Sequence, residues 1–377
     1  MSMKCIINGK LIVNDAIIEG KILYFDNNIV KIDDKIDDNT VEVIDAKNNF
    51  VSAGFIDIHI HGSGGADVMD ATHEALEILS NTLLQTGTTS FLATTMTMSI
   101  EKIDKALQSV QKFSKGVSGA NILGVHLEGP FINVDKHGAQ DQVYIQFPNF
   151  NLIENYMDIV KMITLAPEIE DSENFIKFIA KEYPHIILSI GHSDASYEKS
   201  KESFSWGISH VTHLFNAMNV YHHRKPGIVG ATFDTEDVSC DVIADLVHTH
   251  ASVLELVQKV KTDNLILVTD AMRAGCMKCG TYDLGGRSVE VSGGKAVLED
   301  GTLAGSVLKM NEALLNMKKH TTMNIAEIVK TVTLTPARKL GIPKGMLKPG
   351  HDADIVIFDE NFSIITTIVN GDEKYKR

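Results

Sequence analysis

The chain has 377 residues, 44% of them hydrophobic, which is enough apolar material for one large α/β domain with an accessory piece. Its 35 Lys and Arg residues face 49 Asp and Glu residues, and the net charge of −14 argues against a nucleic-acid-binding or anionic-membrane-binding surface. Four cysteines, and no apolar run of signal-peptide or membrane-spanning type, predict a cytoplasmic protein without disulfides.

The two ends of the chain share one pattern. Residues 1–50 alternate short runs of β-type residues with Asn, Asp and Gly turns, which is typical of meandering antiparallel strands. The same pattern returns in residues 346–377. Because chain ends often lie close together, we expect residues 1–53 and 346–377 to form one small sheet domain.

Residues 54–345 repeat strand, loop and amphipathic helix. Their strands are nearly continuously apolar, as in a parallel sheet covered on both faces, and we predict eight: residues 55–61, 89–95, 122–129, 162–168, 186–192, 210–216, 240–248 and 265–271. Helical spacing of apolar residues separates many of them. Eight strands alternating with helices predict an α/β fold, the (β/α)8 barrel. The Gly-rich residues 275–305 are predicted to be a hairpin insertion.

Polar residues end most of these strands. In a (β/α)8 barrel the chemistry lies at the carboxyl ends of the strands, and the residues there are His59, His61, His126, Glu128, His192, His210, His213, His248 and Asp270. Any one histidine alone is more often a hydrogen-bonded residue at a loop junction. The set together favours a divalent-metal site, because imidazole and carboxylate are the common ligands of catalytic metals.

Such a site predicts hydrolysis of an amide. A metal ion lowers the pKa of bound water and polarises a carbonyl group. Asp270 could then take the proton of that water and deliver it to the leaving nitrogen. Taken by itself, the sequence around Asp270 would instead indicate an ordinary loop or N-cap aspartate.

Longer motifs carry a family resemblance. They include GFIDIHIHGSGGADVMD (54–70), GVHLEGPFIN (124–133), GHSDAS (191–196), VTHLFNAMN (211–219), HHRKPGIVG (222–230), LVTDAM (267–272) and the tail GMLKPGHDADIVIFD (345–359). The chain resembles the amidohydrolase superfamily, and within it the N-acetylglucosamine-6-phosphate deacetylases. The resemblance implies a metal-dependent (β/α)8 barrel over residues 54–345 with a small β-sandwich domain from both termini, and a homodimer. It also implies a phosphorylated amino sugar as substrate, deacetylated to glucosamine 6-phosphate and acetate.

The resemblance implies a role for each matching residue. Glu128, His192 and His213 would hold one divalent ion, and His59 and His61 a second, so that one or two ions of Zn, Fe or a similar metal bind per subunit. Asp270 would be the catalytic acid and base. The implied substrate contacts are Ala139, Gln140, Asn216, Ala217, His223, Arg224, His248, Leu303, Ala304 and Gly305. Gln140 stands where some members have a histidine.

A physical argument supports the implied role of Arg224. Residues 222–225 are the most basic short stretch in the central part of an acidic chain. Guanidinium binds phosphate oxygens in a bidentate manner, so a sugar phosphate would find its counter-charge there. Without the resemblance, a solvated loop with chance charges remains an alternative.

Three alternatives stay open. The substrate could be N-acetylgalactosamine 6-phosphate or another small amide, although most cyclic-amide hydrolases would carry a lysine in place of Glu128. A catalytically inactive assembly protein is disfavoured by the retained histidines and Asp270. Cys276 and Cys279 form a single CxxC without a second pair, which favours two reduced loop thiols over a zinc site.

Overall fold

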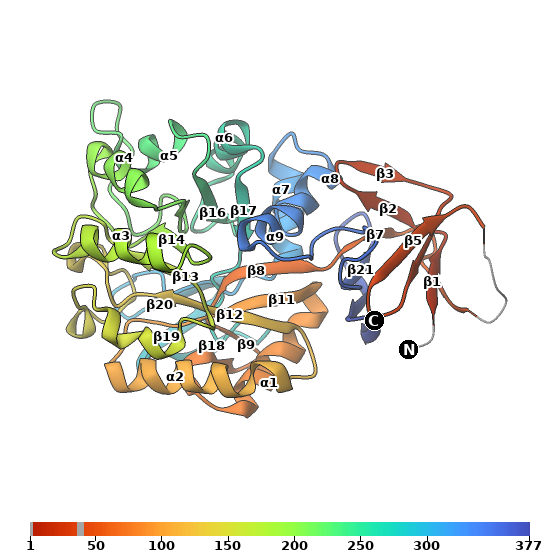
Figure 1. The fold of residues 1–377 in the computed structure, drawn as a ribbon, viewed down its shortest axis with the longest axis horizontal. Coiled ribbons are helices and arrows are strands. Elements are labelled where there is room, and N and C mark those ends of the chain that lie inside the picture. Colours follow the sequence, from red (N-terminus) through yellow and green to blue (C-terminus); the bar gives the residue numbers. More distant parts are fainter. Residues whose placement is uncertain (1–2, 36–40) are drawn as a thin grey trace.

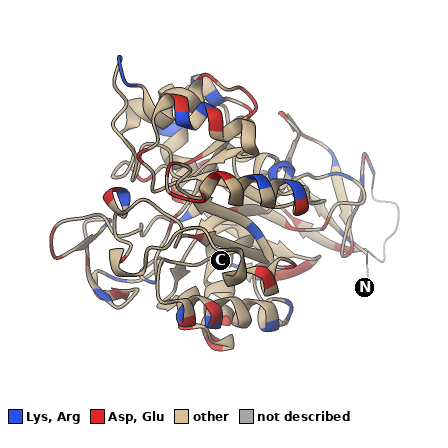
Figure 2. Cartoon of the chain, turned by 60° about the vertical axis from the view of Figure 1, so that its left-hand side comes forward, with Lys and Arg blue, Asp and Glu red and all other residues tan. Residues whose placement is uncertain are grey.

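A computed structural model describes residues 3–35 and 41–377 and shows two regions (Figure 1). The larger one is built around parallel strands enclosed by helices, and the smaller one consists of sheets at the right of the figure, where both chain ends lie. Lys, Arg, Asp and Glu residues colour mainly the outer helices and loops (Figure 2). None of the helices in the described ranges is long and apolar enough to cross a membrane.

The larger region confirms the predicted barrel fold. Its eight strands pair in parallel and in chain order: β8 (Phe55–Ile60), β11 (Thr88–Thr94), β12 (Asn121–Glu128), β13 (Val160–Leu165), β14 (Ile187–Ile190), β15 (His210–Val211), β16 (Ser239–Ile243) and β17 (Leu265–Val268). The last strand returns beside the first, where Asp270 N donates to His59 O at 2.8 Å. All eight predicted strands are present, so their carboxyl ends meet at one opening.

Amphipathic helices cover the barrel. They are α1 (His73–Leu83), α2 (Ile100–Phe113), α3 (Ser172–Glu182), α4 (Tyr197–Trp206), α5 (Gly227–Phe233), α6 (Ala251–Lys261), α7 (Met310–His320), α8 (Ile325–Lys330) and α9 (Leu334–Leu340). In α2, residues at three- and four-residue spacing, such as Ile103 and Leu107, are fully buried, and Ser99 caps the first turn by accepting from Lys102 N. The α1 segment stops at Gly87, whose φ of 80° suits glycine.

Both chain ends build the smaller region. One sheet has the order β5 (Ile29–Asp33), β4 (Ile22–Phe25), β1 (Lys4–Ile7) and β6 (Glu42–Asp45). The other has the order β23 (Asp372–Lys376), β22 (Ile364–Val369), β21 (Ile355–Phe358), β7 (Phe50–Ala53), β2 (Lys10–Val13) and β3 (Ala16–Ile18). This confirms a separate sheet region of both termini. The boundaries at residues 53 and 346 stay a prediction.

Several predicted strands end earlier than expected, and those predicted at 240–248 and 210–216 end earliest, five residues before their predicted ends. The strand predicted at 240–248 ends at Ile243, because the Asp245 carboxylate accepts hydrogen bonds from Val247 N and His248 N and so turns the chain. The strand predicted at 210–216 has only two residues, because left-handed backbone begins at His213, with a φ of 32°. A side chain ends the first of these strands, and a backbone conformation ends the second.

The predicted insertion after the eighth strand is a meander of three strands, one more than a hairpin. These are β18 (Gly280–Leu284), β19 (Arg287–Ser292) and β20 (Lys295–Leu298), all antiparallel. A second small ribbon, β9 (Gly62–Ser63) and β10 (Ala66–Asp67), follows the first barrel strand. The meander and the ribbon both lie in loops that follow the carboxyl ends of barrel strands, so they shape the rim of the opening.

A buried ion pair joins the two regions. Asp354 lies just before β21, and its carboxylate accepts from Lys344 Nζ at 2.7 Å and from Asn370 N at 2.8 Å. The same carboxylate reaches the barrel through Ser90 and Asn121 at 3.3 and 3.4 Å. The side chains of Lys344 and Asp354 are only 9% and 4% exposed, so both charges are largely removed from water.

Lys344→Met is expected to destabilise the protein by about 3–5 kcal/mol, because it leaves the buried Asp354 carboxylate without its counter-charge. The measurement is chemical denaturation of the full chain at pH 7. The control is Lys105→Met, which removes an exposed lysine paired with Glu101 on α2 and should change stability much less. Equal effects of the two variants would contradict a structural role for the buried pair.

Candidate active site

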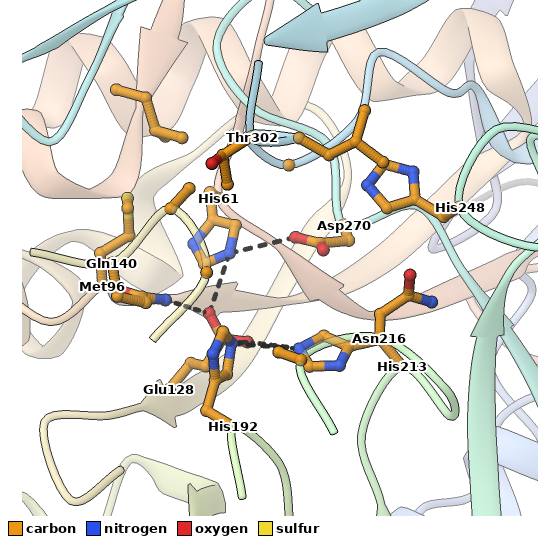
Figure 3. A pocket seen from close by; sticks show the side chains of 16 residues that line it. His61, Met96, Glu128, Gln140, His192, His213, Asn216, His248, Asp270 and Thr302 are labelled. Carbon is orange, nitrogen blue, oxygen red and sulfur yellow. Dashed lines mark hydrogen bonds and ion pairs between the residues drawn. The ribbon is translucent and has the colours of Figure 1, made fainter. Parts of the chain in front are cut away.

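One carboxylate lies at the centre of the opening, surrounded by imidazoles (Figure 3). Glu128 is the last residue of β12, and its Oε1 lies 3.2 Å from His192 Nε2 and 3.1 Å from His213 Nε2. His59 Nε2 is 3.3 Å from the same oxygen, and His61 Nε2 is 3.3 Å from Oε2. The structure therefore brings together all five residues that the sequence predicts as metal ligands.

The donor set fits a divalent cation. The atoms of two triplets lie within 4.8 Å of one another: those of His59, His61 and Glu128, and those of Glu128, His192 and His213. Both ring nitrogens of the fully buried His59 lack a hydrogen-bond partner. Buried polar atoms are normally satisfied, and coordination by Nε2 would satisfy one of them. Because Glu128 belongs to both triplets, it could bridge two ions.

Left-handed backbone directs several of these side chains inward. His192, His213 and Asp270 each follow a strand end and have φ values of 50°, 32° and 47°. Such conformations are costly for residues other than glycine and persist where the surroundings enforce them. Asp270 is held on both sides, since its N donates to His59 O at 2.8 Å and its O accepts from Ser306 N at 2.7 Å.

Asp241, on β16, is a site residue that the sequence reasoning missed. Its fully buried carboxylate accepts from His213 N at 2.5 Å and pairs with His210 Nε2 at 2.9 Å. It thereby holds the backbone of a predicted metal ligand. An acidic residue inside an otherwise apolar strand was the available signal, because a buried carboxylate needs partners.

Two of the histidines predicted at strand ends, His126 and His210, make hydrogen bonds within the barrel instead of facing the pocket. His210 is occupied by Asp241 and by Ser239, whose hydroxyl lies 2.7 Å from Nδ1. His126 lies between Ile58 O at 3.1 Å and the Thr164 hydroxyl at 2.7 Å. Burial holds the pKa of His126 well below its ordinary value, and the neighbouring His59 adds to this. His126 is therefore neutral, and both of its nitrogens are already in use.

Asp270 lies across the opening from Glu128. Its Oδ1 is 3.2 Å from His61 Nε2 and 3.5 Å from His59 Nε2, and the residue is 9% exposed. Burial by itself raises the pKa of this carboxyl, but the two histidines outweigh burial and hold the pKa below its ordinary value. Asp270 is thus an ionised carboxylate that can accept a proton.

A pocket of about 240 Å³ opens above the cluster. Most predicted residues line it: His61, Glu128, Ala139, Gln140, His192, Asn216, Ala217, His213, His248, Asp270, Leu303 and Gly305. His59 lies buried beneath the lining, and Ala304 is buried between two lining residues. Lining residues that the sequence reasoning did not select are Met96, Gly138, Leu284 and Thr302; nothing in their residue types indicates a site.

The structure places Arg224 and His223 outside this lining. Both are exposed, and Arg224 Nη1 lies 2.8 Å from His223 Nε2. They belong to the loop before α5, which protrudes beyond the helices in Figure 1. His248, by contrast, faces the pocket with its Nδ1 held by the Asp245 carboxylate at 2.7 Å, which leaves Nε2 available.

Known proteins resemble this chain along nearly its whole length. The model of the amidohydrolase family matches residues 50–374. The chain belongs to the amidohydrolase family. It is 40% identical over 353 residues to an N-acetylglucosamine-6-phosphate deacetylase of Lysinibacillus sphaericus, covering 92% of this chain and 91% of that relative. It is 31% identical over 338 residues to an N-acetylgalactosamine-6-phosphate deacetylase of Escherichia coli O157:H7, covering 88% and 89%.

A solved structure agrees with this assignment. The crystal structure of N-acetylglucosamine-6-phosphate deacetylase from Pasteurella multocida superposes on this amidohydrolase with a TM-score of 0.95 at 30% identity, covering 100% of both chains. The family resemblance expected from the motifs is therefore confirmed, and so is the barrel fold. This amidohydrolase family membership also agrees with divalent-metal binding by the His and Glu cluster.

Without metal, this amidohydrolase keeps protons in the cluster. Burial would lower the pKa of His213, but hydrogen bonding and charge from Glu128 raise it to about 9. His61 has a pKa well above its ordinary value, because Asp270 and Glu128 outweigh burial. Burial raises the pKa of Glu128, yet His59 and His192 bring it well below its ordinary value. Protons thus take the place of a cation around the carboxylate.

Metal binding is therefore expected to release protons. A group whose pKa is about 9 is protonated at pH 7, and only neutral imidazole coordinates a metal. We expect at least about one proton released at pH 7, because His213 alone supplies one, and an affinity for Zn²⁺ that rises at least about tenfold per pH unit until pH reaches about 9. Calorimetric titration of metal-free protein in two buffers of different ionisation enthalpy gives the proton count. A count near zero at pH 7 would contradict the protonated cluster.

Proposed function

We propose that this amidohydrolase removes the acetyl group from N-acetylglucosamine 6-phosphate to give glucosamine 6-phosphate and acetate. The observation that carries the proposal is the Glu128 carboxylate shared by four imidazoles at the floor of a pocket, with Asp270 facing it. The relatives that match nearly the whole chain support the same reaction, since the Lysinibacillus sphaericus protein is such a deacetylase.

Divalent metal is part of the proposal. Glu128, His192 and His213 would hold one ion, and His59 and His61 with Glu128 a second; Zn and Fe suit imidazole ligands. When bound, the metal lowers the pKa of a coordinated water and polarises the acetamide carbonyl group. Lys136 O accepts from His192 Nδ1 at 2.9 Å, which fixes the tautomer in which Nε2 faces the cluster.

Asp270 carries the proton in the proposed reaction. Its Oδ1 takes a proton from the attacking water and later gives that proton to the amine nitrogen as the amide bond breaks. Because its pKa lies below the ordinary value, the carboxyl group is ionised at neutral pH and so can accept a proton. The backbone hydrogen bonds of Asp270 to His59 O and from Ser306 N fix the main chain that carries this carboxylate at the pocket wall.

Sugar binding would use the rest of the lining. Asn216 and His248 offer hydrogen-bonding groups to the sugar, and the backbone around Ala139, Ala217, Leu303 and Gly305 shapes the wall. The Asp245 carboxylate orients the His248 ring. The substrate is thus a small molecule, and the net charge of −14 speaks against nucleic acid or membrane as partner. A cytoplasmic location is proposed from the cysteines, all four of which are free.

The phosphate group is the reason to propose a homodimer. Among the described residues, the lining contains no Lys or Arg, whereas a phosphate dianion needs a cationic partner. Arg224 and His223 lie on the protruding loop, next to Val220 and Tyr221, which are 85% and 47% exposed. We propose that this loop of one subunit packs against a second copy and brings Arg224 to that copy's pocket.

The galactosamine epimer is the alternative substrate. The Escherichia coli O157:H7 relative that acts on N-acetylgalactosamine 6-phosphate matches 88% of this chain. The two sugars differ only in the orientation of one hydroxyl group, and the reaction at the acetamide is the same. Comparison of kcat/KM for the two phosphorylated sugars decides between them.

Asp270→Asn is expected to lower kcat for acetate release from N-acetylglucosamine 6-phosphate by about 10²–10⁴-fold, because the proton carrier is lost. Metal content, measured by elemental analysis of the same preparation, should stay unchanged. The control is Asp237→Asn, an exposed aspartate, which should keep full activity. Near-normal turnover of the Asp270 variant would remove this carboxylate from the mechanism, and no acetate release by the metal-loaded wild type would overturn the proposed function.

Arg224→Ala is expected to raise KM for the phosphorylated sugar about 10- to 100-fold, with a smaller change in kcat, because a charged hydrogen bond to phosphate is lost. Mixed dimers test which subunit supplies it. When Arg224→Ala and Asp270→Asn chains are unfolded and refolded together, each mixed dimer has one pocket with Asp270 intact and an intact Arg224 from the other chain, so a low-KM activity returns. No recovery would place Arg224 in its own subunit's site.

A further inference from the structure

Gln140 lies in the pocket wall, but protein groups already occupy its side-chain amide. Oε1 accepts from Thr97 N at 2.7 Å, and Nε2 donates to Glu128 Oε2 at 2.8 Å (Figure 3). The partners determine the orientation of the amide: a backbone N–H can only donate, so the oxygen faces Thr97 and the NH₂ group faces the carboxylate. The residue is 4% exposed.

The backbone of Gln140 is fixed as well. Its N donates to His137 O at 2.9 Å, and its O accepts from His137 Nδ1 at 2.9 Å. Gly138, with a φ of 58°, allows this tight turn. Each of the four polar groups of Gln140 therefore has a protein partner. Such a residue is a fixed donor rather than an adaptable group that waits for a ligand.

The same loop also holds a second member of the cluster. Lys136 O accepts from His192 Nδ1 at 2.9 Å, and Lys136 Nζ pairs with Asp194 at 3.0 Å. The loop of residues 136–140 thus contacts His192 at one end and Glu128 at the other. Partners of this kind orient metal ligands and tune the affinity of a site.

We propose that Gln140 is a positioning residue, which fixes the Glu128 carboxylate for metal binding and acts on the sugar only through it. The proposal rests on the proposed role of Glu128 as a metal ligand. Oε1 of Glu128 faces His59, His192 and His213, whereas Oε2 faces His61. Since the Gln140 amide holds Oε2, it prevents the carboxylate from rotating away from these four imidazoles.

Gln140→Leu is the test, because leucine has a similar volume and forms neither side-chain hydrogen bond. Affinity for Zn²⁺, measured by competition with a chromophoric chelator, should fall about 10- to 100-fold. The visible spectrum of the Co²⁺-loaded variant should differ from that of the wild type. KM for N-acetylglucosamine 6-phosphate at saturating metal should stay within about twofold, because no substrate contact is removed.

Controls separate this role from general destabilisation. Asn311 lies on α7, outside the pocket lining, and its side-chain amide donates to Phe362 O at 3.2 Å. Asn311→Leu also removes a side-chain amide, but it should leave the affinity for Zn²⁺ unchanged. Gln140→Met replaces Gln140→Leu if the latter does not fold. Unchanged Zn²⁺ affinity in a folded Gln140 variant overturns the proposal, whatever happens to KM.

Glu128→Ala distinguishes failure of this inference from failure of the proposed function. Loss of bound metal in Glu128→Ala, with unchanged affinity in Gln140→Leu, would contradict only the role of Gln140. Wild-type metal content in Glu128→Ala would instead contradict the ligand role of Glu128, and with it the metal site of the proposed function.

Discussion

One buried carboxylate is the interaction on which the site depends. Glu128 is 2% exposed, and a carboxylate removed from water costs several kcal/mol unless charges and hydrogen bonds compensate. Four imidazoles and the amide of Gln140 supply that compensation. The pKa of Glu128 therefore lies well below its ordinary value despite burial, and the carboxylate stays ionised. The carboxylate is a fixed negative charge, and the imidazoles around it can lose their protons. A divalent cation can therefore take the place of those protons.

The barrel supplies the rigidity that this cluster needs. The predicted metal ligands come from β12, from the residues after β14 and β15, and from the end of β8, so strand pairing sets their separation. Buried acids between strands add to this. Asp57 on β8 accepts from the Thr269 hydroxyl at 2.6 Å, and burial raises its pKa to about 7. The Asp241 carboxylate likewise accepts a hydrogen bond from His213 N, which holds the left-handed backbone there. Backbone conformations that are costly in isolation are stable here because several strands enforce them.

Sequence patterns predicted most of the fold and the residues of the cluster. Apolar runs of strand length and helical periodicity are local properties, and all eight barrel strands were found from them. Errors came where a side chain ends a strand, as Asp245 does after Ile243, because hydrogen bonds to loop backbone leave no periodic signal. Asp241 was missed for a similar reason: its partners are close in space and distant in the chain. The family resemblance implies Arg224 as a substrate contact and its charge supports this, but neither says which pocket the side chain reaches.

The sequence by itself determined the barrel and the His, Glu and Asp residues at its strand ends, because the alternation of strands and the order of these residues are written along the chain. Only the tertiary structure decided which atoms meet. It placed four imidazoles on one carboxylate, set Asp270 opposite, left Arg224 on an exposed loop, and bound the Gln140 amide to Thr97 and Glu128. The physical reason is that hydrogen bonds and charge pairs depend on distances of about 3 Å between residues far apart in sequence, and strand pairing sets those distances.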